Sequence, residues 1–262
     1  MRSRVLAIAG SDSGGGAGIQ ADIKTITALG GYAATAITAL TVQDTRAVYA
    51  VHPVPPSFVT CQIEHALADP GADAVKVGML AEKAVVAAVA AALRPAAGIP
   101  IVVDPVIMAS SGRRLLAEDA LAVLRSDLFP LATLITPNIP EAELLSGITI
   151  RDRPSMERAA RALGPGAVLV KGGHLPGETV MDVLASPEAV IWFDSPRFPG
   201  PPRHGTGCTL ASAIAAGLAQ GLLLPGAIRR ARAYVHAAIA AGTGSLNHAV
   251  TLDPDRIGAL RD

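Results

Sequence analysis

The chain has little cysteine, few aromatic residues and no excess charge of either sign. Its 262 residues include two cysteines, Cys61 and Cys208, and 3% of the residues are aromatic. Two cysteines exclude a disulfide-stapled scaffold and fit a reducing cytosol. Acidic and basic residues number 22 each, so the formal net charge is zero. This balance gives no general attraction for nucleic acid or for an anionic membrane, and we expect neither as a partner.

Long hydrophobic runs are also missing. The longest alanine- and valine-rich run covers residues 84–93, whereas a membrane-spanning helix needs about 20 apolar residues. The apolar run at residues 5–9 stops at Gly10 and is shorter than the core of a signal peptide. Half of the chain is nevertheless hydrophobic, which suffices for a substantial core. These features predict a cytoplasmic globular protein.

Short apolar or β-branched runs alternate with helical patterns along the whole chain. The expected strands cover residues 5–9, 33–40, 48–52, 74–77, 101–103, 133–135, 167–170, 181–184 and 190–193. The expected helices cover residues 19–29, 57–67, 82–93, 118–124, 141–145, 156–163, 209–219 and 225–241. Strands that alternate with helices predict an α/β layered fold with a largely parallel sheet. No stretch has the composition of an interdomain linker, so we expect one domain over residues 1–262.

Five polar residues follow expected strands, namely Asp12, Gln43, Asp104, Asn138 and Lys171. In open parallel sheets, ligands bind beyond the carboxyl ends of the strands. The chain has only four lysines, and Lys171 is the one that ends an expected strand and precedes two glycines, which makes it a candidate ligand-binding residue. The sequence therefore predicts a ligand site at this edge of the sheet.

The segment RHGTGCTLA at residues 203–211 is a glycine-rich turn that opens onto an alanine-rich helix. Gly205, Thr206 and Gly207 would leave backbone amides aimed at one point in front of that helix, where the helix dipole adds positive potential. We expect the same field to favour the thiolate of Cys208 over its ordinary pKa of about 8.5. An anion cradle beside an activated thiol suggests transfer of a group to or from a phosphate.

Two other glycine-rich segments resemble phosphate loops without matching them. Residues 14–18 (GGGAG) lack the G-x-G-x-x-G spacing of dinucleotide-binding proteins. Residues 18–25 (GIQADIKT) place Ile23 where a Walker A loop needs its second glycine. A Rossmann dehydrogenase and a P-loop ATPase are both disfavoured.

A cysteine hydrolase is an alternative from a different class. Cys208 begins a helix, as a nucleophile should, and His204 or His174 would serve as its base. However, Leu210 and Ala211 follow where a nucleophile elbow needs glycine. The histidines and cysteines also lack the paired spacing of zinc ligands.

Seven motifs in order connect the chain to one family. They are IAGSDSGGGAGIQAD at residues 8–22, ITALTVQ at 37–43, KVGML at 76–80, VDPV at 103–106, TPNIPE at 136–141, KGGH at 171–174 and HGTGCT at 204–209. Together they resemble the ribokinase-like kinases and, within them, the hydroxymethylpyrimidine/phosphomethylpyrimidine kinases. The resemblance implies a three-layer α/β/α sandwich with a mostly parallel central sheet, and commonly a homodimer. It also implies phosphorylation, with ATP and Mg²⁺, of 4-amino-5-hydroxymethyl-2-methylpyrimidine and then of its monophosphate, to the pyrophosphate, in thiamine biosynthesis.

The resemblance places the transferred phosphoryl group in the cradle of Gly205, Thr206 and Gly207. Cys208 takes the position where many ribokinase-like sugar kinases have an aspartate base. Its thiolate would accept the proton of the attacking alcohol. In the alternative interpretation, Cys208 shapes the pocket and phosphate oxygens take the proton.

The nucleotide and the metal are assigned to polar residues at the sheet edge. Lys171 resembles the family lysine that bridges the ATP phosphates, and Thr206 is expected to bind the nucleotide as well. Asn138 is expected to contact a phosphate or a metal-bound water. Asp104 and Glu141 offer the hard oxygen ligands that Mg²⁺ prefers, so we expect them to hold the metal directly or through water. Asn138 and Glu141 also suit a helix cap, a structural role compatible with this one.

Gln43, Asp22 and Met79 are the expected substrate-binding residues. A glutamine amide matches the ring nitrogen and exocyclic amino group of an aminopyrimidine, as it matches adenine. Asp22 would orient the hydroxymethyl group or the ring, or would serve only as an acid near a helix N-terminus. Met79 would form an adaptable apolar wall against the ring, or would simply fill the core.

Two alternatives share the expected fold. Pyridoxal or pyridoxine kinase is the nearest, because members of this branch share the cysteine turn and act on a heteroaromatic alcohol of similar size. A catalytically silent pyrimidine sensor is the other, and the set Asp104, Glu141, Lys171 and Cys208 disfavours it. Residues 108–112, which contain serine and glycine, are the expected lid.

Overall fold

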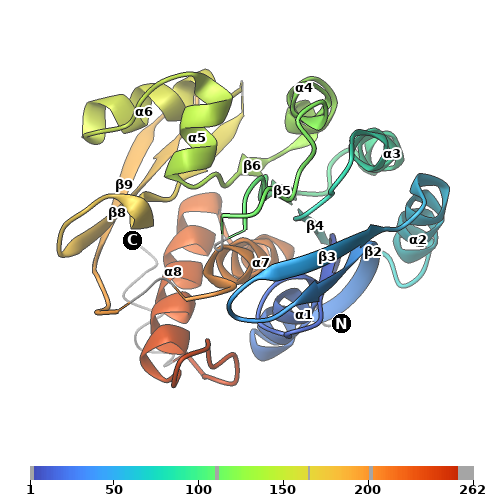
Figure 1. The fold of residues 1–262 in the computed structure, drawn as a ribbon, viewed down its shortest axis with the longest axis horizontal. Helices are drawn as coiled ribbons and strands as arrows, with labels where there is room; N and C mark the ends of the chain where they lie inside the picture. Colours follow the sequence, from blue (N-terminus) through green and yellow to red (C-terminus); the bar gives the residue numbers. More distant parts are fainter. Residues whose placement is uncertain (1–2, 110–111, 165, 201–202, 253–262) are drawn as a thin grey trace.

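A nine-stranded sheet runs through the molecule (Figure 1). The computed structural model describes residues 3–109, 112–164, 166–200 and 203–252. The strands are β1 (Arg4–Asp12), β2 (Tyr32–Gln43), β3 (Val48–Pro53), β4 (Ala74–Val77), β5 (Ile101–Val103), β6 (Leu134–Ile135), β7 (Ala167–Val170), β8 (Thr179–Ala185) and β9 (Val190–Pro196). Their order across the sheet is β3-β2-β1-β4-β5-β6-β7-β8-β9.

The strands from β2 to β7 in this order run parallel, whereas β3, β8 and β9 pair antiparallel. The predicted α/β fold with a largely parallel sheet is therefore confirmed, and the strands expected at residues 181–184 and 190–193 pair as the hairpin of β8 and β9. Because parallel strands share a direction, β1, β2, β5, β6 and β7 all deliver their carboxyl ends to one edge of the sheet.

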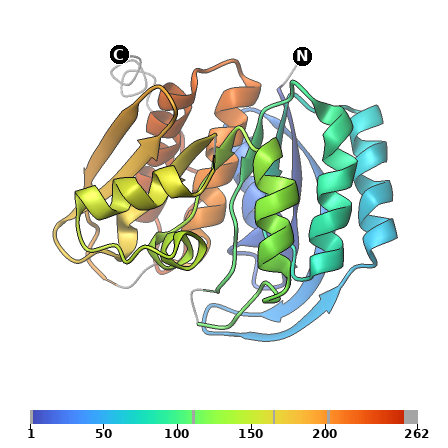
Figure 2. The same cartoon turned by 90° about the horizontal axis from the view of Figure 1, so that it is seen from above.

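Helices cover both faces of this sheet, which gives the three expected layers. They are α1 (Gly18–Ala28), α2 (Pro56–Ala68), α3 (Lys83–Leu93), α4 (Ala120–Val123), α5 (Ile139–Ser146), α6 (Arg153–Ala162), α7 (Thr206–Ala219) and α8 (Leu224–Ala240). Side chains of α1, α7 and α8 form one buried apolar cluster, and side chains of α2 to α6 form another on the opposite face. In Figure 2, α2, α3 and α4 stand in a row on one side of the sheet. None of the described helices is both long and apolar enough to cross a membrane.

Three helices differ most from their expected bounds, and one of them, α6, begins at Arg153 rather than at residue 156. The pattern at residues 118–124 forms only a four-residue α-helix, which continues as a π-helix over Leu124–Leu128. The last-but-one helix begins at Thr206 rather than at residue 209, because the glycine turn itself supplies its cap. The expected lid at residues 108–112 is described only in part, since residues 110–111 lie outside the described residues.

A backbone contact fastens the start of α7 to the loop between β1 and α1. Gly205 caps α7 with φ 84° and ψ 0°, in the left-handed region that favours glycine. A Cβ atom at this position would overlap the carbonyl oxygen of Gly16. Only glycine lets the two loops approach so closely.

Replacing this glycine should therefore destabilise the protein more than replacing a matched one. A positive φ costs an alanine roughly 1–2 kcal/mol, and this cost applies to both Gly205→Ala and Gly221→Ala, since Gly221 has φ 79°. A Cβ at Gly221 meets nothing within 4 Å among the described residues, whereas one at Gly205 displaces the Gly16 loop. Urea unfolding should give the larger loss of unfolding free energy for Gly205→Ala. Equal losses would contradict the proposed contact.

Candidate active site

The sheet edge gathers the five polar residues that were expected to follow strands. Asp12 and Gln43 are the last residues of β1 and β2, and Asp104 and Lys171 directly follow β5 and β7. Asn138 lies just beyond β6 and forms an isolated bridge with Lys171. The start of α7 meets this edge from the α1, α7 and α8 layer.

The first turn of α7 presents backbone amides to the edge. Helix geometry leaves the amides of Gly207 and Cys208 without a partner inside the helix. The Thr206 hydroxyl donates to the Arg203 carbonyl at 2.7 Å, so this side chain stabilises the turn. The anion cradle expected from residues 205–207 stays a prediction, and it would be built from backbone amides, since the Thr206 side chain is occupied by Arg203.

Lys171 and Asp104 form an ion pair directly against this turn. The Lys171 Nζ atom lies 2.7 Å from Asp104 Oδ1, and the Thr136 hydroxyl donates to the same oxygen at 3.1 Å. A Cβ atom built on Gly207 would lie 3.3 Å from Lys171 Nζ and 3.5 Å from Asp104 Oδ2. Burial alone would lower the pKa of Lys171, but the Asp104 and Glu141 carboxylates outweigh it and raise that pKa. The ammonium therefore stays charged beside the α7 amides.

Glu141 is held by backbone amides at the start of α5. Its Oε1 atom accepts from the Ile107 amide and its Oε2 atom from the Asn138 amide, both at 3.0 Å. The Glu141 amide in turn donates to the Asn138 side chain at 2.9 Å, which completes a capping box. Burial raises the pKa of Glu141, and the nearby Lys171 ammonium opposes the rise. The expected cap is thus formed, and it orients Glu141 toward Lys171.

Cys208 does not have the acidity that the sequence suggested. Its side chain is half-buried in the first turn of α7. Burial raises the pKa of the thiol to about 11, and the carboxylates of Asp22 and Asp104 add to the rise. The Lys76 ammonium and a hydrogen bond from the Gly18 amide oppose it. The expectation of a favoured thiolate is wrong, because desolvation and two anions outweigh the effect of the Lys76 ammonium.

Asp22 lies beneath the site, away from any surface. Its side chain is 0% exposed, and both carboxylate oxygens lie 2.9 Å from Lys76 Nζ. The Ser212 hydroxyl donates to Asp22 Oδ1 at 2.7 Å. The structure therefore does not bring this carboxylate to a position where it could touch a bound molecule.

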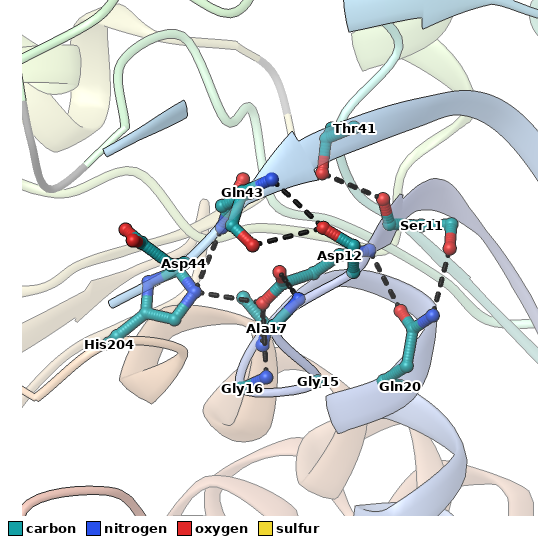
Figure 3. Close-up of polar contacts among 12 residues, drawn as sticks. Ser11, Asp12, Gly15, Gly16, Ala17, Gln20, Thr41, Gln43, Asp44 and His204 are labelled. Carbon is teal, nitrogen blue, oxygen red and sulfur yellow. Dashed lines mark hydrogen bonds and ion pairs between the residues drawn. The ribbon is translucent and has the colours of Figure 1, made fainter. Parts of the chain in front are cut away.

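Gln43 and His204 meet above the glycine loop, as Figure 3 shows. The Gln43 amide nitrogen and His204 Nε2 are 2.9 Å apart, and the same histidine nitrogen lies 2.9 Å from Asp12 Oδ2. Asp12 also accepts hydrogen bonds from the amides of Gly14, Gly16 and Ala17. Burial would raise the pKa of Asp12, but His204 and these amides outweigh it and lower that pKa. The Asp12 carboxylate thus links His204, which lies beside Gln43, to the loop before α1.

Met79 belongs to a small apolar cluster apart from the two main cores. It is 8% exposed and packs with Ala39 and Ala81, and the partly buried Val51, Val106 and Leu115 adjoin them. The cluster lies between the ends of β2 and β4. The position suits an apolar wall at the sheet edge.

Sequence reasoning gave no role in this site to Asp12, His204 or Lys76. Asp12 was noted only for following a strand, and His204 only as the base of an alternative hydrolase. Lys76 had a signal of its own, because it interrupts the otherwise apolar strand Ala74–Val77. A charged residue inside a buried strand requires a partner, which here is Asp22.

A groove opens farther along the same edge, beside the hairpin of β8 and β9. It is lined by Gly177, Glu178, Thr179, Asp194, Ser195, Pro196, Arg197, Phe198 and Pro199. The Arg197 guanidinium holds one wall, since it donates to the carbonyls of Gly173, Leu175 and Gly177. The first residue that lines the groove, Gly177, follows Lys171 by a few positions in the sequence.

Two relatives match most of the chain. It is 48% identical over 264 residues to the thiamine biosynthesis bifunctional protein ThiED of Geobacter sulfurreducens, with 97% of this chain but only 54% of that protein covered. It is 46% identical over 260 residues to the hydroxymethylpyrimidine/phosphomethylpyrimidine kinase of Rhizobium meliloti, with 95% of this chain and 97% of that protein covered.

Two solved structures share the fold. The phosphomethylpyrimidine kinase of Clostridium difficile superposes with a TM-score of 0.81 at 40% identity, covering 91% of this chain and all of that one. The pyridoxal kinase of Staphylococcus aureus in complex with AMP-PCP and pyridoxal gives a TM-score of 0.85 at 31% identity, covering 95% of this chain and 94% of that one. The family model described as phosphomethylpyrimidine kinase matches residues 12–252. The chain therefore belongs to the phosphomethylpyrimidine kinase family of ribokinase-like kinases.

Proposed function

We propose that residues 1–262 form one catalytic domain that uses ATP to phosphorylate 4-amino-5-hydroxymethyl-2-methylpyrimidine and then its monophosphate. The observation that carries the proposal is the convergence of the α7 amides, Lys171 and Asp104 at one sheet edge. Backbone amides and a lysine supply the positive potential that a transferred phosphoryl group needs. Gln43 and Met79 stand at the same edge, where the acceptor would bind.

The nucleotide would lie along this edge, with its phosphates toward α7. The γ-phosphoryl group would accept hydrogen bonds from the amides of Gly207 and Cys208, and Lys171 would bridge the phosphates. The groove lined by residues 177–179 and 194–199 would take the nucleoside. A neighbour of the same fold has been solved with AMP-PCP, an ATP analogue, which supports ATP as the donor.

In the reaction, the hydroxymethyl oxygen of the substrate attacks the γ-phosphorus. The new O–P bond forms as the bond from the γ-phosphorus to the bridging oxygen breaks, and the electron pair of that bond stays on ADP. We assign the hydroxyl proton to the Cys208 sulfur, which requires that the thiol first gives its own proton to solvent water; the transfer then restores the thiol. The alternative is that Cys208 shapes the pocket and a phosphate oxygen takes the proton.

Mg²⁺ fits the donor set, although the protein alone does not form a cage for it. Within the described residues, no three His, Cys, Asp or Glu side chains converge as metal ligands. Mg²⁺ commonly binds one or two carboxylates together with phosphates and waters. Asp104 suits this mode, since its Oδ2 atom faces the start of α7, and Glu141 would act through water. When bound, the ion would neutralise charge on the phosphates.

Gln43 is proposed to recognise the aminopyrimidine edge through its amide group. The Gln43 amide nitrogen lies 2.9 Å from His204 Nε2 at the end of β2. Met79 and Val106 would then cover the ring with apolar surface. Asp22 is not assigned a substrate contact, because it is fully buried.

The substrate assignment is tested by comparing two vitamin precursors. Purified protein with ATP should phosphorylate the hydroxymethylpyrimidine with a higher kcat/KM than pyridoxal, because Gln43 pairs with an aminopyrimidine edge that pyridoxal lacks. The similarity to a pyridoxal kinase structure makes pyridoxal the appropriate competitor. An ADP-release assay with each alcohol gives both constants. An equal or higher kcat/KM with pyridoxal would overturn the substrate assignment in favour of a pyridoxal kinase.

Two substitutions separate the roles of the thiol and the lysine. Cys208→Ser should lower kcat by about 10²–10⁴-fold, the usual contribution of a general base, with the KM for ATP nearly unchanged. Lys171→Ala should lower kcat and also raise the KM for ATP, because it removes a charge from the phosphate site. Cys61→Ser and Lys83→Ala, at exposed positions, are the matched controls. Full activity of Cys208→Ser would remove the thiol from catalysis, and an unchanged Lys171→Ala would refute the placement of that lysine.

A homodimer and a cytoplasmic location complete the proposal. Both cysteines are free thiols, as a reducing compartment would leave them.

At the edge of the sheet, Leu40 and Val42 on β2 are 48% and 58% exposed, and their register partners His52 and Ala50 on β3 share that face. Exposed apolar surface of this kind favours burial against a second copy.

The dimer is tested by charging this face. Val42→Glu should convert a dimer into a monomer in light scattering at micromolar concentration, because the new carboxylate would lose its hydration in the interface. The matched control is Leu144→Glu, at another exposed apolar position on α5. A wild-type protein that is already monomeric would contradict the proposed dimer.

A further inference from the structure

The fully buried ion pair of Lys76 and Asp22 lies under the site and contacts neither the proposed phosphate position nor the proposed substrate position. Lys76 on β4 and Asp22 on α1 are both 0% exposed, and Lys76 Nζ lies 2.9 Å from each oxygen of Asp22. Ser212 on α7 donates to Asp22 Oδ1 at 2.7 Å. The pair thus connects three elements inside the α1, α7 and α8 layer.

The surroundings of this pair are apolar. Lys76 pairs in register with Ala7 on β1 and with Val102 on β5, both members of the apolar cluster on that face. A buried ion pair adds little net stability, since an apolar pair of similar volume is often as stable or more so. Stability alone therefore does not account for this pair.

Cys208 lies one helical turn from the pair. Residues four apart share a face of a helix, so Cys208 stands beside Ser212, whose hydroxyl touches Asp22. The thiol thus lies one turn of α7 away from the hydroxyl that touches the buried pair.

Four charged groups face Cys208 from the elements packed around it. They are Lys76 from β4, Asp22 from α1, Asp104 after β5 and Lys171 after β7. The two ammonium groups favour a negative charge on the sulfur, and the two carboxylates oppose it. Lys171 and Asp104 offset each other through their own contact, which leaves Lys76 and Asp22 as the second pair.

We infer that Lys76 is a positioning residue for phosphoryl transfer, whose buried ammonium stabilises the negative charge that Cys208 acquires when it gives up its proton. Asp22 holds the ammonium in place and, with Asp104, keeps it charged in an apolar setting. This inference rests on the proposed role of Cys208 as the base. Lys76 itself touches neither substrate nor nucleotide.

The test measures the acidity of Cys208 directly, apart from turnover. All variants carry Cys61→Ser, so that iodoacetamide can alkylate only Cys208, and mass spectrometry follows the rate against pH. The main variant is Lys76→Met with Asp22→Asn, which removes both charges with little change of volume. Removing either partner alone breaks the buried pair, which is destabilising, and Asp22→Asn is the milder case because Asp104 still acts on Lys76. Asp22→Asn alone is therefore the second variant, and Lys83→Met, on the exposed start of α3, is the matched control.

The two variants should shift the alkylation profile in opposite directions. The double variant loses Lys76, the larger effect on the thiol, together with the smaller opposing effect of Asp22, so its profile should move to higher pH and alkylation at a fixed pH below the pKa should be slower. Asp22→Asn removes an opposing anion while Asp104 keeps Lys76 charged, so its profile should move to lower pH. Lys83→Met should leave the profile unchanged. Shifts of the double variant and of Asp22→Asn in the same direction would overturn the inference. If only one of the two folds, an unshifted alkylation profile of that variant would overturn it as well.

Kinetics distinguish a failure of this inference from a failure of the proposed function. If the thiol is the base, kcat of the double variant should fall and the KM for ATP should stay unchanged. Opposite alkylation shifts without any phosphate transfer by the wild type would sustain the electrostatic role and refute the kinase. Transfer by the wild type with an unmoved alkylation profile would sustain the kinase and refute the role of Lys76.

Discussion

The close approach of Gly205 to the Gly16 carbonyl is the constraint on which the rest of the site depends. It fixes where α7 begins, and therefore where the unpaired amides of Gly207 and Cys208 point. A side chain at either loop would separate α7 from the edge of the sheet. The anion site is thus a consequence of two glycine loops that pack against each other without side chains between them.

Asp12 adds a polar fastening to this backbone contact. It gathers three amides of the loop before α1 and also binds His204, which directly precedes Gly205 (Figure 3). The same histidine nitrogen contacts Gln43 at the end of β2. The proposed substrate side and the proposed phosphate side therefore both lie against one histidine.

Much of this arrangement was predictable from the sequence because it follows from local patterns. Alternating strands and helices gave the parallel sheet, and a parallel sheet places Asp104 and Lys171 at one edge without further information. The capping box of Asn138 and Glu141 depends on residues three apart, so its spacing is readable directly. The glycine turn before Cys208 likewise predicted the start of a helix at this edge, whereas its role as an anion site stays a prediction.

Other features depend on contacts between distant parts of the chain. Asp22 and Lys76 are 54 residues apart, and nothing local to either says that they meet. As a result, Asp22 was expected to contact substrate, whereas it lies beneath the site. The acidity of Cys208 was also misjudged, because the dipole of α7 is a local feature but the burial and the neighbouring carboxylates are not. Long-range charge and desolvation are the terms that a sequence pattern does not contain.

The central claim is that the start of α7 and Lys171 together hold the group being transferred. The most direct measurement is a crystal structure with a non-hydrolysable ATP analogue. The account predicts γ-phosphate oxygens about 3 Å from the amides of Gly207 and Cys208 and within reach of Lys171 Nζ. A terminal phosphate bound elsewhere, with those amides and that lysine left unengaged, would contradict it.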